Sequence, residues 1–157
     1  MSSLHLKLVT LTGTKFEGDV YEVTLPTIDG EIGVLPGHMP LVSAAKTGVI
    51  AVRKQRRDSD REREYFATAG GVIEVVDNTL TVLVDEADHA ADINRAEAEA
   101  AHQRALDEKA KAGTQVELDK AHALIDRHAV RLRVADLHHR HRRYQTINRP
   151  KAAALQR

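Results

Sequence analysis

The chain has 157 residues, carries 23 basic and 23 acidic side chains, and contains no cysteine. This length suits one domain of ordinary size, or a small domain with an appendage. The lack of cysteine excludes disulfides, zinc sites with thiolate ligands and cysteine nucleophiles. No apolar run approaches the ~18 residues of a membrane-spanning helix, and no signal peptide opens the chain. We therefore expect an intracellular protein without direct membrane insertion, which reaches a membrane only through partners.

The first half is predicted to form β-strands. Apolar and polar residues alternate in its opening run, as they do in a half-buried strand. Asp77 and Asn78 separate the last two runs and are typical of a hairpin turn. Such runs cover residues 4–9, 20–25, 49–52, 64–67, 72–76 and 79–84. Short strands separated by turn signals predict an antiparallel sandwich or barrel.

The segment from Pro26 to Leu41 holds three of the four prolines and three glycines in sixteen residues. Proline fixes φ and glycine permits positive φ, so the segment is predicted to be one loop of defined shape. Its apolar centre, Ile32, Val34 and Leu35, indicates that the loop packs on the fold or meets a partner. A turn system between strands is the simpler interpretation of the same residues.

Residues 53–64, RKQRRDSDRERE, carry no apolar side chain and mix both signs of charge. They are compatible with a nucleic-acid patch or with a solvated hairpin tip. The interleaved acids oppose contact with phosphates, so the solvated tip is favoured.

The second half is predicted to form two helices. Residues 90–112 are rich in strong helix formers, with Asp92 as the candidate cap and Gly113 as a left-handed end. Thr114 and Glu117 have the spacing of a capping box that opens the second helix. The apolar stripe of that helix comprises Leu118, Ala121, Ile125, Ala129, Leu132 and Ala135. Because alanine buries little area, we expect this hairpin to dock weakly and to be the mobile part of the molecule.

The two halves also differ in charge. Residues 1–88 hold 9 basic and 14 acidic side chains, a net charge of 9 − 14 = −5, and the remainder carries +5. Seven of the nine histidines lie at or after His89. We expect two structural units, at residues 1–88 and 89–143, and a flexible tail at residues 144–157.

Catalytic and metal-binding patterns are sparse. The chain has no glycine-rich phosphate loop, no G-x-S-x-G and no H-E-x-x-H pattern. His138 and His141 share a helical face, but the arginines beside them oppose a cation, so a solvated basic face is favoured over a metal site. His38 is expected to pack or to contact a partner. We expect no catalytic residue, no metal and no required cofactor.

The first half carries two distinctive blocks: Phe16 to Leu41, which contains GEIGVLPGHMPL, and GGVIEVVDNTLTVL at residues 70–83. These blocks resemble the epsilon subunit of F-type, proton-translocating ATP synthases. Residues 131–135, RLRVA, follow the pattern of that family's helical end. The resemblance implies an N-terminal antiparallel β-sandwich of about ten strands followed by a C-terminal antiparallel two-helix hairpin.

The resemblance also implies a non-catalytic central-stalk subunit, peripheral to the cytoplasmic face of the bacterial plasma membrane. In the family, the sandwich contacts the gamma subunit and the c subunits of the membrane ring. The helices, when extended toward the catalytic beta subunits, block ATP hydrolysis. The implied stalk and ring interface comprises Gly30, Glu31, His38, Met39 and Pro40. The implied beta-subunit contacts are Arg127, Arg131, Arg133 and Arg140.

Some bacterial members bind regulatory ATP between the helices through a D-x-x-R-A motif, which residues 92–96 match. Two residues near it, Ala91 and His102, depart from the family pattern. Arg127 and Arg131 are four residues apart on one helical face, so both could reach one phosphate chain. The resemblance implies nucleotide contacts at Glu86, Asp92, Arg95, Arg127 and Arg131. The other interpretation, in which Asp92 only caps a helix and Arg95 only lies on its surface, stays open.

A second function class is a free-standing β-sandwich binding module that uses a basic helical hairpin to engage RNA or an acidic protein. The loop GEIGVLPGHMPL distinguishes the two, because a nucleic-acid module has no reason to carry it. We therefore favour the stalk subunit, with no nucleic-acid partner.

Overall fold

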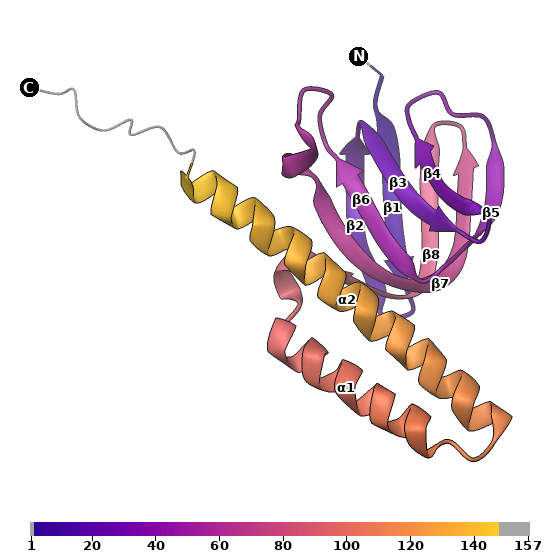
Figure 1. Ribbon diagram of the computed structural model, residues 1–157. Helices are drawn as coiled ribbons and strands as arrows, with labels where there is room; N and C mark the ends of the chain where they lie inside the picture. The colour runs from indigo at the N-terminus through magenta and orange to yellow at the C-terminus, as the bar shows by residue number, and fades with distance from the viewer. Residues whose placement is uncertain (1, 148–157) are drawn as a thin grey trace, which may run out of the picture.

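The computed structural model describes residues 2–147, and the side chains of residues 2–143, as eight strands followed by a helical hairpin (Figure 1). The strands are β1 (Leu4–Thr10), β2 (Gly13–Val20), β3 (Glu22–Thr27), β4 (Gly30–Val34), β5 (Leu41–Ala45), β6 (Gly48–Arg53), β7 (Glu64–Val76) and β8 (Thr79–His89). The helices are η1 (Asp60–Glu62), η2 (Ala90–Asp92), α1 (Arg95–Lys111) and α2 (Gln115–Ile147).

The long strands β7 and β8 each contribute to both layers of the sandwich. The first half of β7 pairs with β6 and its second half with β5, while β8 pairs with β7 along most of its length and with β1 at its start. The pairings in the described chain are antiparallel, except that β1 and β8 run parallel. The expectation of about ten strands is corrected to eight, because these two strands serve two layers and count once each.

The prediction of two separate strands at residues 64–67 and 72–76 is wrong, because both runs belong to the single strand β7. Gly71 makes this possible, because a Cβ atom at this position would lie 1.9 Å from the Leu83 carbonyl oxygen of β8. The two backbones therefore approach more closely than any other residue would permit.

The prediction that the proline- and glycine-rich segment forms one loop is wrong. Pro26 lies inside β3, and Gly30–Val34 forms β4, which pairs with β3 as a hairpin. The Thr27 hydroxyl donates to the Gly30 carbonyl oxygen at 2.6 Å and closes the turn between them. Only the residues between Val34 and Leu41 form a loop, so the alternative of a turn system between strands describes the segment better.

The predicted hairpin turn at Asp77 and Asn78 is confirmed. Both residues have positive φ, 46° and 58°, which matches the twist of a two-residue hairpin. The Asn78 side chain accepts a hydrogen bond from the Gly37 amide at 2.9 Å and donates to the Ser3 carbonyl oxygen. The turn thereby connects the loop after β4 to the start of the chain.

The predicted cap of the first helix is corrected from Asp92 to Asn94. The Asn94 side-chain oxygen accepts from the Glu97 amide at 3.1 Å, and α1 begins at Arg95. Asp92 lies in η2 instead, because the extended Ile93 separates that short turn from α1.

The junction between α1 and α2 is closed by the predicted capping box. The Thr114 hydroxyl accepts from the Glu117 amide at 3.2 Å, and the Glu117 carboxylate accepts from the Thr114 amide at 3.3 Å and the Gly113 amide at 2.9 Å. Gly113 does not have positive φ, so the expected left-handed end of the first helix is wrong. The carboxylate satisfies the amides that a left-handed residue would otherwise have redirected.

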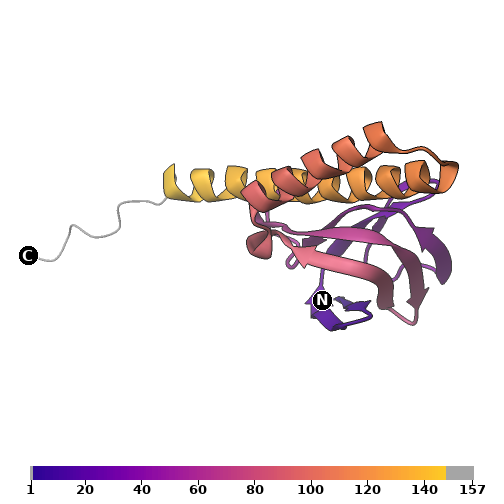
Figure 2. The ribbon, with the colours of Figure 1, turned by 90° about the horizontal axis from the view of Figure 1, so that it is seen from below.

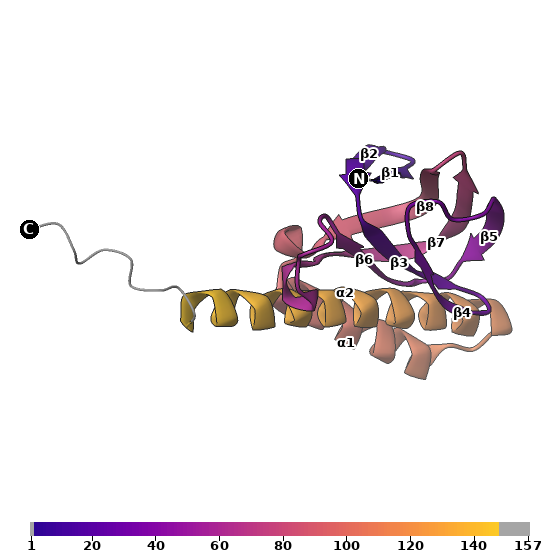
Figure 3. The ribbon, with the colours of Figure 1, turned by 90° about the horizontal axis from the view of Figure 1, so that it is seen from above.

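The helical hairpin forms a layer on one side of the sandwich (Figures 2 and 3). The α2 helix contacts both α1 and the sheet, whereas α1 packs mainly against α2. Within the predicted apolar stripe, Ala121 and Ala135 are buried but Ala129 is exposed. The helix extends to Ile147, beyond the expected end at residue 143, and the rest of the expected tail lies outside the described residues. In the described part of the chain, we find no helix that is both long and apolar enough to span a membrane.

The main core lies between the two layers of strands, and each of its buried members falls between Leu4 and Ala87. We therefore expect a fragment of residues 1–88 to fold without the helices, because it retains all of that apolar burial. Circular dichroism and cooperative urea unfolding of the fragment test this. A fragment with the spectrum of a random coil would contradict the division into two units.

Candidate functional site

One face of α2 docks on the sheet. Its centre is apolar: Val134 is fully buried and packs in a cluster with Ala67 of β7 and Ala90 of η2, to which Val130 adds. This face is not among the predicted features, because charged residues interrupt it in the sequence. A signal was available, because Val130 and Val134 lie three residues after Arg127 and Arg131, respectively, and therefore share one helical face with them.

Two ion pairs flank the apolar centre. Arg127 pairs with Glu86, and Arg131 Nε lies 3.1 Å from an Asp88 carboxylate oxygen. Glu86 and Asp88 are two residues apart on β8 and therefore share a face of the strand, while the arginines are one helical turn apart. Because the four side chains are partly withdrawn from water, these pairs are worth more than fully exposed ones.

A third contact lies further along α2. The His141 ring stands 5.4 Å from the Tyr65 ring, centroid to centroid, and its Nε2 atom is 3.3 Å from the Asp60 carbonyl oxygen. The Tyr65 hydroxyl donates to the same oxygen at 3.2 Å. The helix, β7 and η1 therefore meet at the backbone of Asp60.

The charged segment 53–64 is not simply a solvated tip. Arg53 and Arg63 both contact Glu22, at 3.1 and 3.3 Å, and both contact Asp60, at 2.5 and 3.0 Å. The two arginine side chains are only 19% and 18% exposed. The expectation is wrong for this part of the segment, because opposite charges along the sequence pair with one another and with β3.

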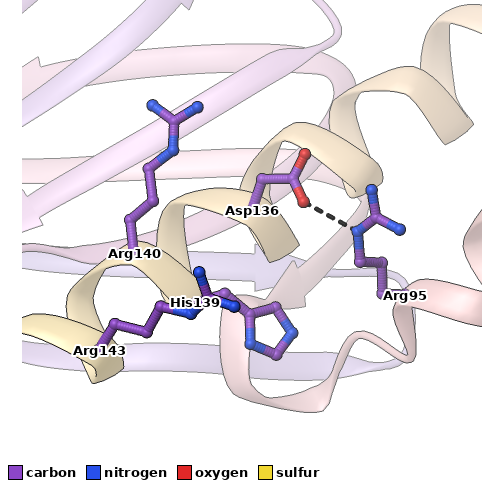
Figure 4. A pocket seen from close by; sticks show the side chains of 5 residues that line it. All are labelled: Arg95, Asp136, His139, Arg140 and Arg143. Atoms are coloured by element: carbon purple, nitrogen blue, oxygen red, sulfur yellow. Dashed lines mark hydrogen bonds and ion pairs between the residues drawn. The ribbon is translucent and has the colours of Figure 1, made fainter. Parts of the chain in front are cut away.

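A second basic cluster lies where α1 begins beside α2 (Figure 4). Arg95 Nε donates to the Asp136 carboxylate at 2.9 Å, and this hydrogen bond raises the pKa of Arg95. Arg95 also pairs with Glu99 at 3.1 Å. His139, Arg140 and Arg143 line the remainder of a cavity of about 510 Å³.

The five predicted nucleotide contacts do not converge in this arrangement. Glu86, Arg127 and Arg131 meet between α2 and the sheet, where both arginines point to carboxylates. Arg95 lies in the separate cluster of Figure 4, and Asp92 is exposed in η2. Of the predicted beta-subunit contacts, Arg133 and Arg140 are exposed, whereas Arg127 and Arg131 face the sheet.

The predicted stalk and ring residues form two groups at opposite ends of β4. Gly30 and Glu31 begin the strand, and His38, Met39 and Pro40 follow its end. The five residues of β4 therefore separate the two groups along the chain. Met39 is 73% exposed, and a His38 ring nitrogen lies 2.7 Å from the Met39 carbonyl oxygen.

The outer face of the sheet carries an apolar row that sequence analysis missed. Val72 on β7 is opposite Ala44 on β5 and Leu83 on β8, and Leu83 is opposite Val9 on β1. Val72 and Leu83 are 48% and 53% exposed, and Val42 nearby is 72% exposed. The signal was present in the sequence, because these residues stand at strand positions where alternation predicts polar side chains.

Two histidines on α2 have lowered pKa values. The pKa of His138 is lowered by burial, by the charges of Arg142 and His89, and by two neighbouring histidines. The pKa of His128 is lowered by burial and by the charges of Arg127, Arg131, His102 and Arg104. The described residues contain no cluster of three or more histidine or acidic side chains that could hold a metal ion. The site is therefore built from ion pairs, buried alanine and valine, and histidines.

We expect the docked hairpin to loosen in mild acid. Burial and the charge of His89 in β8 belong to the docked state and lower the pKa of His138. The docked state is therefore fully favoured above pH ~6.5, and the released helix binds the extra proton as the pH falls below that value. Hydrogen exchange of the α2 amides, corrected for intrinsic rates, should rise between pH 7.5 and pH 5.5. His138→Asn should reduce this dependence, whereas His122→Asn, at an exposed position elsewhere on α2 and not among the groups that shift His138, should preserve it. Equal behaviour of the two variants would contradict the prediction.

Comparison with known proteins places these features in context. Residues 3–90 match the family model described as ATP synthase, Delta/Epsilon chain, beta-sandwich domain. The chain is 35% identical over 135 residues to the ATP synthase epsilon chain of Chloroflexus aggregans. This alignment covers 86% of this chain and 94% of the relative. The chain is also 31% identical over 142 residues to ATP synthase epsilon chain 2 of Photobacterium profundum, covering 90% and 95%.

The fold is also similar to chains in two solved assemblies. One is the Euglena gracilis mitochondrial ATP synthase, OSCP/F1/c-ring, with a TM-score of 0.72 at 19% identity over 86% of this chain and 82% of the other. The second is the central stalk and c-ring of the Tetrahymena thermophila mitochondrial ATP synthase, with a TM-score of 0.54 at 16% identity over 83% and 95%. At these identities the likeness supports the fold.

Proposed function

The chain belongs to the family of ATP synthase epsilon chains, and from this premise we propose that it is a non-catalytic subunit of the central stalk. In this role it couples rotation of the proton-driven membrane ring to ATP synthesis in the catalytic head. The observation that carries the proposal is the likeness to the Chloroflexus aggregans epsilon chain, which spans 94% of that relative and so includes both sandwich and helices. The alternative of a free-standing RNA-binding or acidic-protein-binding module has no support among these relatives. We place the chain peripherally at the cytoplasmic face of a bacterial plasma membrane.

The exposed apolar row on the outer sheet face is suited to a permanent partner. Val42, Val72 and Leu83 together present exposed apolar surface, and covering it with a partner would be favourable in free energy. We assign this face to the gamma subunit. The β3–β4 turn with Glu31 and the loop with His38 and Met39 remain our candidates for contacts with the stalk and the c subunits of the ring.

The helical hairpin is proposed as the inhibitory element. Docked, it is held by the Arg127 and Arg131 ion pairs and by Val134. Released, the same arginines, with Arg133 and Arg140, offer positive charge to acidic surfaces of the catalytic beta subunits. Because the docked contacts are few and partly exposed, a small difference in binding free energy is enough to shift the population between the two states.

Regulatory ATP is proposed to bind in a rearranged hairpin. The contacts proposed for it are Glu86, Asp92, Arg95, Arg127 and Arg131, which do not converge while Arg127 and Arg131 are paired to the sheet. A nucleotide phosphate chain must therefore compete with the carboxylates of Glu86 and Asp88 for the two guanidinium groups. This competition gives the proposal a distinctive test.

Arg127→Ala or Arg131→Ala is expected to weaken ATP binding to the isolated chain by about 1.5–3 kcal/mol, the usual worth of a charge-assisted hydrogen bond. Asp88→Asn should have the opposite effect, because it removes a competitor for Arg131. Calorimetry at millimolar ATP measures both. The absence of binding heat in the unmodified chain would exclude the nucleotide role and leave the stalk role intact.

The stalk role itself is tested by assembly. The chain is expected to co-purify with the catalytic head and the membrane ring from cells that express it with a small affinity tag. Membranes from cells that lack it should lose proton-driven ATP synthesis, and the purified chain should restore it. A chain that does not co-purify with the complex would overturn the proposal.

A further inference from the structure

An open groove of about 990 Å³ lies at the end of the sandwich where the chain begins, which is the end seen in Figure 3. Val20 and Tyr21, at the junction of β2 and β3, supply its apolar surface. Lys54, Arg56 and Arg57, from the segment after β6, line it as well. The groove therefore combines apolar surface with three cationic side chains.

The fold separates charges that alternate along this segment of the sequence. Asp60 is occupied by Arg53 and Arg63. Glu62 accepts hydrogen bonds from the Ser59 amide and hydroxyl, at 2.8 and 2.9 Å. These hydrogen bonds and, to a smaller extent, the charge of Arg57 lower the pKa of Glu62, but within the described residues neither Asp60 nor Glu62 forms an ion pair with Arg56 or Arg57.

Asp58 is occupied in the same way, since its carboxylate accepts from the Gln55 amide at 2.8 Å. In the part of the chain that the structure describes, Arg56 takes part in no hydrogen bond or ion pair, and Arg57 donates through Nε to the Gln55 side chain at 2.9 Å. Lys54 is paired with Glu64 at 2.5 Å. Arg56 and most of the Arg57 guanidinium group therefore remain available to an anionic ligand.

We propose that this groove binds an acidic, extended peptide segment of a partner chain. Carboxylates of the segment pair with Arg56 and Arg57, which suit bidentate recognition, and an apolar side chain packs against Val20 and Tyr21. The volume is near the upper end of small-ligand pockets and far exceeds one phosphate group. The Gln55 amide, which could have contributed to a phosphate site, already donates to Asp58.

The proposal rests on the proposed function, because the partner is sought within the assembled ATP synthase. The photoreactive residue p-benzoylphenylalanine is placed at position 55, in the lining of the groove, so that the cations are kept. The complex is purified and irradiated, and the cross-linked peptide is identified by mass spectrometry. The expected product is a peptide rich in aspartate and glutamate from another subunit.

Charge reversal supplies the decisive comparison. Arg56→Glu combined with Arg57→Glu is expected to reduce the cross-linked product about tenfold or more, because like charges then face each other. Lys15→Glu combined with Lys109→Glu changes the net charge equally at exposed positions outside the groove, and should leave the product unchanged. Equal loss in both pairs, a cross-link to lipid, or a peptide without acidic residues would overturn the proposal. If the complex assembles but forms no cross-link, the groove proposal is wrong and the proposed function stands. If the chain never assembles into the complex, both proposals are wrong.

Discussion

Gly71→Ala is expected to destabilise the sandwich more than any other single methyl group added to the chain. A Cβ atom at this position would lie 1.9 Å from the Leu83 carbonyl oxygen and 2.8 Å from the Val84 Cα atom, both of them backbone. Since β7 pairs with β8 on either side of this point, the strands cannot separate locally without loss of hydrogen bonds. We expect a loss of about 3 kcal/mol or more in the free energy of unfolding, a large part of the 5–15 kcal/mol typical of a domain.

Urea unfolding followed by circular dichroism measures this loss, and Gly18→Ala is the matched control. Gly18 also lies in a strand, but its added Cβ would meet only the Phe16 ring, at 3.9 Å, which is an ordinary contact. The control should change the free energy of unfolding by about 1 kcal/mol or less. Similar stabilities of the two variants would show that the approach of β7 to β8 is not as close as described.

A chain that ends at Asp92 is expected to leave ATP synthesis coupled and to raise ATP hydrolysis by the assembled complex several-fold. The truncation keeps the whole sandwich core and the buried Ala90, but removes both long helices, which are the proposed inhibitory element. Hydrolysis by purified complexes that contain the full or the truncated chain is compared at saturating ATP. Unchanged hydrolysis would remove the regulatory role from the hairpin.

A milder variant separates the charge of α2 from its presence. Arg133→Ala with Arg140→Ala removes two exposed cations while the docked contacts of Val134 and Arg131 stay in place. If these cations meet acidic surfaces of the beta subunits, the double variant should relieve inhibition partly. The difference from the unmodified chain should shrink as salt is added, because screening weakens exposed charge pairs.

The elements that local chemistry specifies could be predicted from the sequence. Asp77 and Asn78 tolerate positive φ and stand between alternating runs, and Thr114 and Glu117 satisfy each other's amides over one helical turn. The predictions that fail concern features that depend on residues distant in the sequence. Nothing local to Gly71 reveals that the Leu83 backbone lies against it, so one strand was divided into two.

The candidate site was predictable in its residue types but not in its geometry. The charges of Arg127 and Arg131 were evident, yet their partners on β8 depend on which face of α2 meets the sheet. That face is set by Val134, whose buried contacts come from β7 and η2. In the same way, the pairing of Arg53 and Arg63 with Glu22 joins residues about thirty to forty positions apart and leaves no local signature.

The parallel pairing of β1 with β8 has a consequence for the order of events on the ribosome. His5 is opposite Thr79, and Val9 is opposite Leu83, so the first strand is translated 79 − 5 = 74 residues before its partner. Leu4, Leu6 and Leu8, which are fully buried in the folded chain, therefore stay exposed to solvent or bound to a chaperone until β8 is made. The helices are synthesised last. The surface on which α2 docks is therefore complete before α2 exists, and each new molecule begins with an uncovered sandwich that its own C-terminal half then closes.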